Sequence, residues 1–159
     1  MAELGRSGRF DHDLAGLASL TQNGALCWRM HRDRVEVLLI TSRDTGRWVI
    51  PKGWPIKGMG SAEAAAREAW EEAGVEGQVA AESTGLFSYV KRFGVNAGVP
   101  CIVFVHALRV RRLARTFPER KQRRRKWFSL AVAARKVAEP ELKALFLAFE
   151  RPGVTETAV

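Results

Sequence analysis

The stretch GWPIKGMGSAEAAAREAWEEAGV, residues 53–75, joins a glycine-rich loop to an acidic helical pattern in a chain whose formal net charge is +9. The loop begins at PKG, and its three glycines and two prolines within residues 51–60 predict a structured loop rather than a helix. Ser61 then predicts an N-cap, residues 62–73 a helix, and Gly74 its left-handed C-terminal residue. This is the most clearly delimited helix of the sequence.

The three glutamates of REAWEEAGV share one face of that helix. At 100° per residue, Glu68, Glu71 and Glu72 fall within an arc of about 100°. Another face carries a smooth stripe that would let the helix lie close against a sheet, with the glutamates pointing away at the rim; this stripe consists of Ala62, Ala66, Ala69 and Ala73.

Like charges at this spacing cost a helix about 0.2–0.5 kcal/mol for each pair, so a compensating cation is expected. Clustered carboxylate oxygens suit hard divalent ions such as Mg²⁺ or Mn²⁺. The alternative is that nearby arginines, including Arg67, neutralise the cluster in an ordinary ion-pair network. The helix by itself leaves both interpretations open.

The whole stretch resembles the signature of the Nudix hydrolases, and six of the seven fixed residues of that signature match in register: Gly53, Arg67, Glu68, Glu71, Glu72 and Gly74. Met59 stands where the signature has its first glutamate, and Ala69 is small for an aliphatic position. In the family that glutamate pairs with the signature arginine, so its absence affects loop rigidity and the orientation of Arg67 more than metal binding.

The resemblance implies an α/β/α sandwich with a mixed sheet and a loop-helix-loop motif. It also implies hydrolysis of a phosphoanhydride bond assisted by Mg²⁺ or Mn²⁺. By position, Glu68 and Glu72 would be metal ligands together with the main-chain carbonyl of Lys52. Glu71 would be the base for the attacking water, although the carboxylate that takes this proton varies within the family.

A closer likeness is to the diphosphoinositol polyphosphate phosphohydrolase branch, through TSRDTGRWVIPKG, GLFSYVKR and RRRKWF. It implies that substrate phosphates are bound by Arg43, Arg92 and Arg123. PKG replaces the PGG of that branch and is similar to dinucleoside tetraphosphate hydrolases, so diadenosine polyphosphates are an equal alternative. Adenine would need an aromatic platform, and the available residues are Trp28, Trp54, Tyr89 and Phe93, each of which also suits packing.

Residues 109–126 carry the whole basic excess, with ten Lys or Arg and one acid, Glu119. Such a segment attracts polyanions, or it is a solvated arginine-rich loop. Glu119 is either a further metal ligand or a local counter-ion. Lys52 and Lys57 could contact substrate phosphates from the loop. The alternative is that they are ordinary flexible lysines of the surface.

The remaining sequence predicts a soluble, cytoplasmic protein of one domain, 1–159, with tails at 1–18 and 151–159. No apolar run is long enough to span a membrane, and Cys27 and Cys101 lie in apolar runs typical of buried thiols. Strands are expected in residues 20–29 and 35–40, which should form a hairpin across the polar stretch MHRDR, and in residues 48–51. Two longer strands should lie at 78–92 and 100–110, and a short one at 126–128. Two helices separated near Pro140 should follow.

Two other functions fit this pattern. A non-catalytic protein that binds RNA or polyphosphate would retain the basic segment, whereas an RNA 5′-pyrophosphohydrolase would use the same chemistry. Base stacking requires aromatic residues among the basic ones, and residues 109–125 contain only Phe117. The intact glutamate helix favours an enzyme acting on a polyphosphorylated small molecule. The sequence leaves the oligomeric state open.

Overall fold

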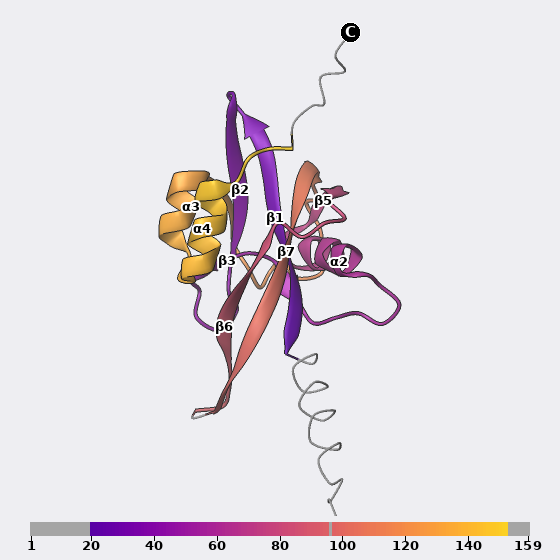
Figure 1. Ribbon diagram of the computed structural model, residues 1–159. Helices are drawn as coiled ribbons and strands as arrows, with labels where there is room; N and C mark the ends of the chain where they lie inside the picture. Colours follow the sequence, from indigo (N-terminus) through magenta and orange to yellow (C-terminus); the bar gives the residue numbers. More distant parts are fainter. Residues whose placement is uncertain (1–19, 96, 153–159) are drawn as a thin grey trace, which may run out of the picture.

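The computed structural model describes residues 20–95 and 97–152. Helices lie on both sides of a central sheet (Figure 1). The elements in chain order are β1 (Thr21–His31), β2 (Arg34–Thr41), β3 (Trp48–Val49), β4 (Lys52–Gly53), α2 (Ser61–Ala73), β5 (Val75–Val79), β6 (Gly85–Phe93), β7 (Ala97–Leu113), β8 (Arg125–Ser129), α3 (Leu130–Lys136) and α4 (Pro140–Ala148). The tails expected at 1–18 and 151–159 fall almost entirely on residues 1–19 and 153–159, which lie outside the described ranges.

The sheet is mixed. Its main order is β3-β2-β1-β7-β5, while β4 pairs with β1, β6 with β7 and β8 with β2. Strands β1 and β7 run parallel, and the other pairs are antiparallel. The predicted β1–β2 hairpin is confirmed, and it turns at Arg32 and Asp33, whose φ angles of 50° and 62° match the right-handed twist of the flanking strands.

Each face of the sheet has its own core. On one face α3 and α4 cover a cluster that includes Leu26, Phe87 and Phe146. On the other face α2 covers a cluster that includes Cys27, Leu38 and Leu108. The two layers of helix around a mixed sheet (Figure 1) confirm the expected α/β/α sandwich.

Helix α2 ends as predicted but begins differently. Gly74 adopts φ 66° and donates its N–H to the carbonyls of Ala69 and Trp70, which closes the helix. The N-cap is Gly60, with no side-chain cap hydrogen bond, so the prediction for Ser61 was wrong. The Ser61 hydroxyl instead lies 2.6 Å from Asn23 Oδ1 and 2.7 Å from His106 Nε2, because these buried polar groups of β1 and β7 need partners.

The buried side of α2 differs in part from the predicted stripe. Ala65, Ala69 and Ala73 are fully buried, whereas Ala62 and Ala66 are only partly covered. Glu72 lies on this buried side and is 7% exposed. The expectation that all three glutamates point away from the sheet was therefore wrong for Glu72, because the helix presents the side of Ala65 and Glu72 to the strands.

The predicted strand at residues 78–92 is two strands. Val79 pairs with Leu108, and Gly85 pairs with Val105, so the chain between them is longer than the facing part of β7. The excess residues leave the sheet as a bend held by the Ser83 hydroxyl, which donates to the Gly85 carbonyl at 2.8 Å. The other predicted strands are present, and the break at Pro140 separates α3 from α4. No helix in the described ranges is long and apolar enough to cross a membrane.

We expect Gly74→Ala to lower the free energy of unfolding by about 2 kcal/mol or more, because alanine resists a positive φ. Its Cβ would also press against the Phe117 ring and the Arg125 guanidinium. Urea denaturation measures the effect. The control is Gly46→Ala, where φ is +70° but no atom lies within 4 Å of the added Cβ. An equal loss in both variants would contradict the role of packing around Gly74.

Candidate active site

A polar cavity of about 430 Å³ opens where the N-terminal half of β1, the β4 loop and one side of α2 meet. Its acidic residues are Asp44, Glu68, Glu72 and Glu119, and its basic residues are Arg43, Lys52, Lys91 and Arg123. Glu68 and Glu72 of α2 therefore share one cavity with residues of the loop after β2, of β4, of β6 and of the loop before β8. These oppositely charged residues lie between positions 43 and 123 of the sequence, so only the folding of the chain brings them together.

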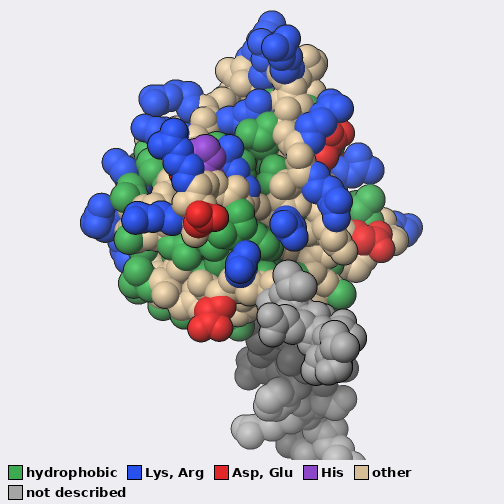
Figure 2. Space-filling view, turned by 90° about the horizontal axis from the view of Figure 1, so that it is seen from above, with side chains coloured by type: hydrophobic (Ala, Val, Ile, Leu, Met, Phe, Trp, Pro, Cys, Tyr) green, Lys and Arg blue, Asp and Glu red, His purple; other side chains and the backbone are tan. Residues whose placement is uncertain are grey.

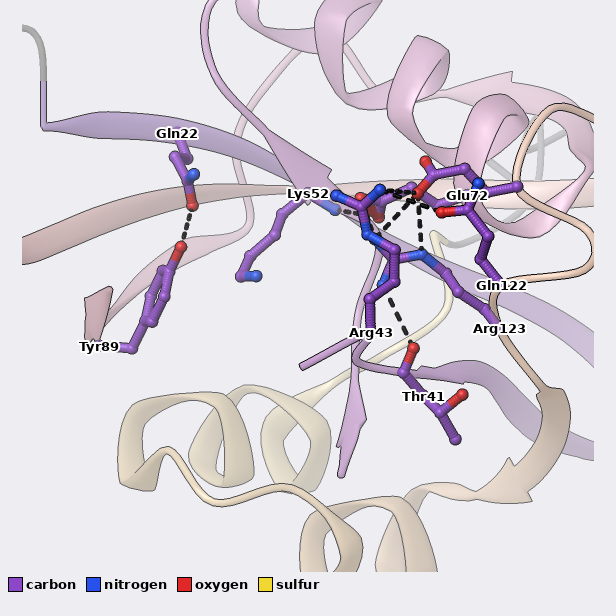
Figure 3. A network of polar contacts seen from close by, with 9 residues as sticks. Gln22, Thr41, Arg43, Lys52, Glu72, Tyr89, Gln122 and Arg123 are labelled. Atoms are coloured by element: carbon purple, nitrogen blue, oxygen red, sulfur yellow. Dashed lines mark hydrogen bonds and ion pairs between the residues drawn. The ribbon is translucent and has the colours of Figure 1, made fainter. Parts of the chain in front are cut away.

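The centre of the cavity is the buried pair of Glu72 and Arg123, whose side chains are each 9% exposed (Figure 3). Arg123 Nη2 donates to Glu72 Oε1 at 3.1 Å, and Arg123 Nη1 donates to the Thr41 carbonyl at 3.2 Å. The other carboxylate oxygen of Glu72 accepts the Lys52 backbone N–H at 3.1 Å. Burial raises the pKa of Glu72 to about 7, although Arg123 and the Lys52 N–H act in the opposite direction.

Glu68 lies one helical turn before Glu72. Its carboxylate packs against Gly53, where any side chain would collide with it. Burial raises the pKa of Glu68, and the negative charges of Glu71 and Glu119 raise it further. Within the described residues, its carboxylate has no hydrogen-bond or ion-pair partner. Arg123 and Lys52 oppose this rise in pKa, so Glu68 is a carboxylate without a direct partner that lies near both acids and cations.

Glu71 stands apart from this cavity. Its side chain does not line it, although its backbone carbonyl accepts the Glu119 N–H at 2.9 Å and so anchors the loop before β8 to α2. That anchor brings the Glu119 carboxylate to 3.3 Å from Arg123 Nη2 and from Arg43 Nη1. Glu119 is therefore a counter-ion in this structure and at the same time a lining carboxylate.

Lys52 belongs to two environments. Its backbone N–H binds Glu72, while its side chain runs away from Glu72 toward Tyr89 (Figure 3). The ammonium lies 4.6 Å from the centre of the Tyr89 ring. Burial lowers the pKa of Lys52, with Lys91 and Arg47 adding to the effect and Glu72 and Glu139 opposing it.

The other expected site residues lie farther out. Arg67 is exposed and, within the described residues, has no ion-pair partner, as Met59 in place of an acid predicts. Arg92 lines a neighbouring cavity instead of this one, and Lys57 is exposed and lines neither. Gly53 allows the close approach of Glu68 described above.

Of the four aromatic candidates, Trp54 lines the main cavity and is 37% exposed. Trp28 is buried and lies in a different cavity, and Tyr89 donates its hydroxyl to Gln22 at 2.6 Å. The side chain of Phe93 lies outside the described part of the structure. Trp54 is therefore the aromatic residue best placed to meet a ligand.

The basic segment at 109–126 does not form one surface. Arg123 lies inside the cavity, and Arg125 donates to the carbonyls of Ala73 and Ala114 at 2.7 and 2.8 Å, which satisfies the C-terminal end of α2. Others, such as Arg111, are exposed on β7, and Figure 2 shows Lys and Arg side chains distributed widely over that end of the molecule with few acids. The basic residues of this segment therefore have three different places: some stabilise the fold, one lies in the cavity, and others are exposed on the surface.

The donor chemistry fits a hard divalent cation in part. Glu68 and Glu72 offer carboxylate oxygens one turn apart on α2, beside the main chain of Lys52. Within residues 20–95 and 97–152, however, no three Asp, Glu, His or Cys side chains gather closely enough to hold a metal ion as they stand. Glu72 and Glu119 are instead turned toward Arg123, so a cation held by both α2 carboxylates requires Arg123 to release Glu72.

Sequence reasoning missed Lys91, Arg47 and Gln22. Lys91 follows Phe87 and Tyr89 at every second position of β6, so strand alternation placed it on the same face as those two rings. Arg47 binds Glu139 through a 2.8 Å contact between Nη1 and Oε1. No local signal identifies Arg47 or Gln22, because their partners lie far away in the sequence.

In buffer with EDTA, ionisation of Glu72 should reduce stability as pH rises. The pKa of Glu72 is raised from 4.5 to about 7 in the folded state, so its stabilising contribution is complete below pH 4.5 and is lost as pH rises through about 7. The loss should approach about 3 kcal/mol. Urea denaturation across this range should show it in the wild type and not in Glu72→Gln. The exposed Glu63→Gln variant should follow the wild type, whereas parallel curves for all three would exclude Glu72 as the cause.

Comparison with known proteins places this geometry in a family. Residues 20–149 match the model of the NUDIX domain. The chain is 32% identical over 112 residues to Nudix hydrolase 16, mitochondrial, of Arabidopsis thaliana, and 33% identical over 106 residues to Nudix hydrolase 13, mitochondrial, of the same plant. These matches cover 69% and 64% of this chain but 62% and 52% of the relatives, so the chain spans little more than half of their length.

Solved structures share the fold at lower identity. An Ap4A hydrolase of C. elegans superimposes with a TM-score of 0.60 at 20% identity, covering 80% of this chain and 93% of the other. The NUDIX domain of Shewanella oneidensis NrtR, solved with ADP ribose, gives 0.61 at 15% identity and covers 89% and 96%. With the loop, helix and cavity already described, the match over residues 20–149 shows that this chain belongs to the NUDIX domain family.

Proposed function

We propose that the protein hydrolyses a phosphoanhydride bond of a polyphosphorylated small molecule with the help of Mg²⁺ or Mn²⁺. The observation that carries this proposal is the shared cavity: the carboxylates of Glu68 and Glu72 face it together with the cations Arg43, Lys52 and Arg123. Acids alone would suit a cation-binding protein, and bases alone a passive anion binder. Both in one cavity suit an anionic substrate that is bound together with a cation.

Glu68 and Glu72 would hold the cation, with the main-chain carbonyl of Lys52 as a further oxygen ligand. When bound, such an ion neutralises phosphate charge and lowers the pKa of a coordinated water. Arg43 is 56% exposed and contacts Glu119 at 3.3 Å, so a phosphate could reach it from solvent, whereas the Arg123 side chain is only 9% exposed. A substrate phosphate that takes Arg123 would replace the Glu72 carboxylate as its partner and release that carboxylate.

Proton removal needs a carboxylate that is not itself neutralised. Glu71 holds this role by its place in the motif, but its side chain lies off the cavity. Glu68 lines the cavity, has a raised pKa and has no cationic partner among the described residues, so it is the second candidate for the base. Because Glu68 is also a proposed cation ligand, the Glu71→Gln variant is the one that separates the two assignments.

Two substrate classes remain. Cations on several sides of the cavity suit a diphosphoinositol polyphosphate, because each phosphate needs charged donors. Trp54 at the cavity edge suits the adenine of a diadenosine polyphosphate, because a partly exposed indole offers a stacking face. RNA with a 5′-triphosphate uses the same bond cleavage and belongs in the same test.

A non-catalytic polyphosphate or RNA binder is the second candidate function. It is favoured by the pairing of Glu72 with Arg123 and by the absence of an acid at Met59, which leaves Arg67 without an ion pair within the described residues. In that case the arginines, not the carboxylates, would carry the function.

The decisive experiment measures product release from the three substrate classes with Mg²⁺ or Mn²⁺. Glu72→Gln should lower kcat about 100-fold or more, because it removes a charged cation ligand. Glu71→Gln should lower kcat to a similar extent if Glu71 is the base, and should leave kcat unchanged if Glu68 is the base. Glu63→Gln is the matched control on the same helix, exposed and away from the cavity.

Turnover by the wild type that Glu72→Gln lacks would support the hydrolase and select its substrate. Binding without turnover across the whole panel would instead support the non-catalytic alternative.

A further inference from the structure

A second cavity of about 280 Å³ adjoins the main one. The two cavities have five lining residues in common, namely Ser42, Asp44, Val49, Lys52 and Lys91. They are therefore neighbouring compartments with a common wall. The carboxylates of α2 line only the first compartment, and Tyr89 and Arg92 line only the second.

The second compartment is strongly cationic. Its charged lining comprises Arg47, Lys52, Lys91 and Arg92 against a single acid, Asp44. Arg47 is neutralised by Glu139 through the 2.8 Å contact, and Lys91 lies 5.7 Å from the centre of the Trp54 ring. Even with Arg47 and Lys91 set aside, the lining holds two cations, Lys52 and Arg92, against the single acid Asp44.

Lys52 is the residue whose position is hardest to explain without a ligand. Its ammonium is partly buried, and within the described residues no hydrogen-bond acceptor meets it. The ammonium instead forms a cation–π contact, with its nitrogen 4.6 Å from the centre of the Tyr89 ring.

The surroundings hold Lys52 in this position. Its backbone N–H is fixed to Glu72 at 3.1 Å, and Tyr89 is fixed by its hydroxyl, which donates to the buried amide oxygen of Gln22 at 2.6 Å. The side chain extends away from Glu72 and toward Tyr89 (Figure 3), and it lines both compartments. A ligand that spans both compartments passes directly over it.

We propose that the second compartment is an anion subsite, with Lys52 as its central residue, that binds a phosphate group on the part of the substrate that is not cleaved. This inference rests on the proposed function, because it divides the substrate into a cleaved and a retained part. It narrows the substrate class to molecules with anionic groups on both sides of the scissile anhydride. A nucleoside diphosphate whose second substituent is neutral leaves the subsite empty.

The test measures binding without metal or turnover. Inorganic tripolyphosphate and inositol hexakisphosphate are titrated by calorimetry in EDTA against the wild type, Lys52→Met and Lys52→Arg. Lys52→Met should weaken both ligands about tenfold, as expected for loss of one charge-assisted contact, and Lys52→Arg should largely restore affinity. Lys57→Met is the matched control, since Lys57 is an exposed lysine of the same loop that lines neither compartment.

Arg92→Gln provides a second variant at an exposed position, should Lys52→Met fold poorly in thermal melts; it should weaken the same ligands a few-fold. Unchanged affinity in Lys52→Met, or equal weakening by Lys57→Met, would overturn the subsite. If the wild type binds these anions through Lys52 but cleaves none of the substrate panel, the subsite stands and the hydrolase proposal fails.

Discussion

The buried pair of Glu72 and Arg123 is the interaction on which the rest of the site depends. It joins α2 to the loop before β8, and the same two side chains also hold the end of β2 through the Thr41 carbonyl and β4 through the Lys52 N–H. Removing one partner of a buried pair leaves the other as an uncompensated charge, at a cost of about 3–5 kcal/mol. Four segments far apart in the sequence are therefore kept in one arrangement by a single charge pair.

Burying the Glu72 carboxylate is energetically unfavourable, because the charged group loses its water of hydration. An apolar side chain at this position would pack as well against the sheet beside Ala69 and Ala73, without the desolvation that raises the pKa of the carboxyl. Buried charges that stability alone does not require are typical of functional sites. The burial of Glu72 therefore agrees with the proposed role of its carboxylate in the site.

The arginines of the basic segment at 109–126 also have different structural roles. Arg125 donates from its two terminal nitrogens to the Ala73 carbonyl at the end of α2 and to the Ala114 carbonyl, a geometry that suits the planar guanidinium. Arg123 pairs with Glu72 and Glu119, and the more exposed Arg43 contacts Glu119. The net charge of this segment therefore does not reveal its function. One of its arginines stabilises the end of a helix, another lies in the cavity, and others are exposed on the surface.

The sequence alone determined the features that depend on local pattern. Glycine and proline defined the loop, Gly74 ended the helix because its positive φ excludes most residues, and the period of the glutamates placed them along one side of α2. Alternation and turn residues likewise located the hairpin of β1 and β2. The family signature supplied the α/β/α sandwich, which local pattern could not.

Only the tertiary structure decided which of those side chains share a cavity. Three glutamates that are equivalent on a helical wheel divide into a buried one, an unpaired one and one outside the cavity, because the sheet covers α2 from one side. Ser61, which the sequence predicts to be an N-cap, instead binds Asn23 and His106, because the sheet places these two residues next to the start of α2. Contacts between distant segments, such as Lys52 with Tyr89, follow from chain topology, and no local pattern encodes them.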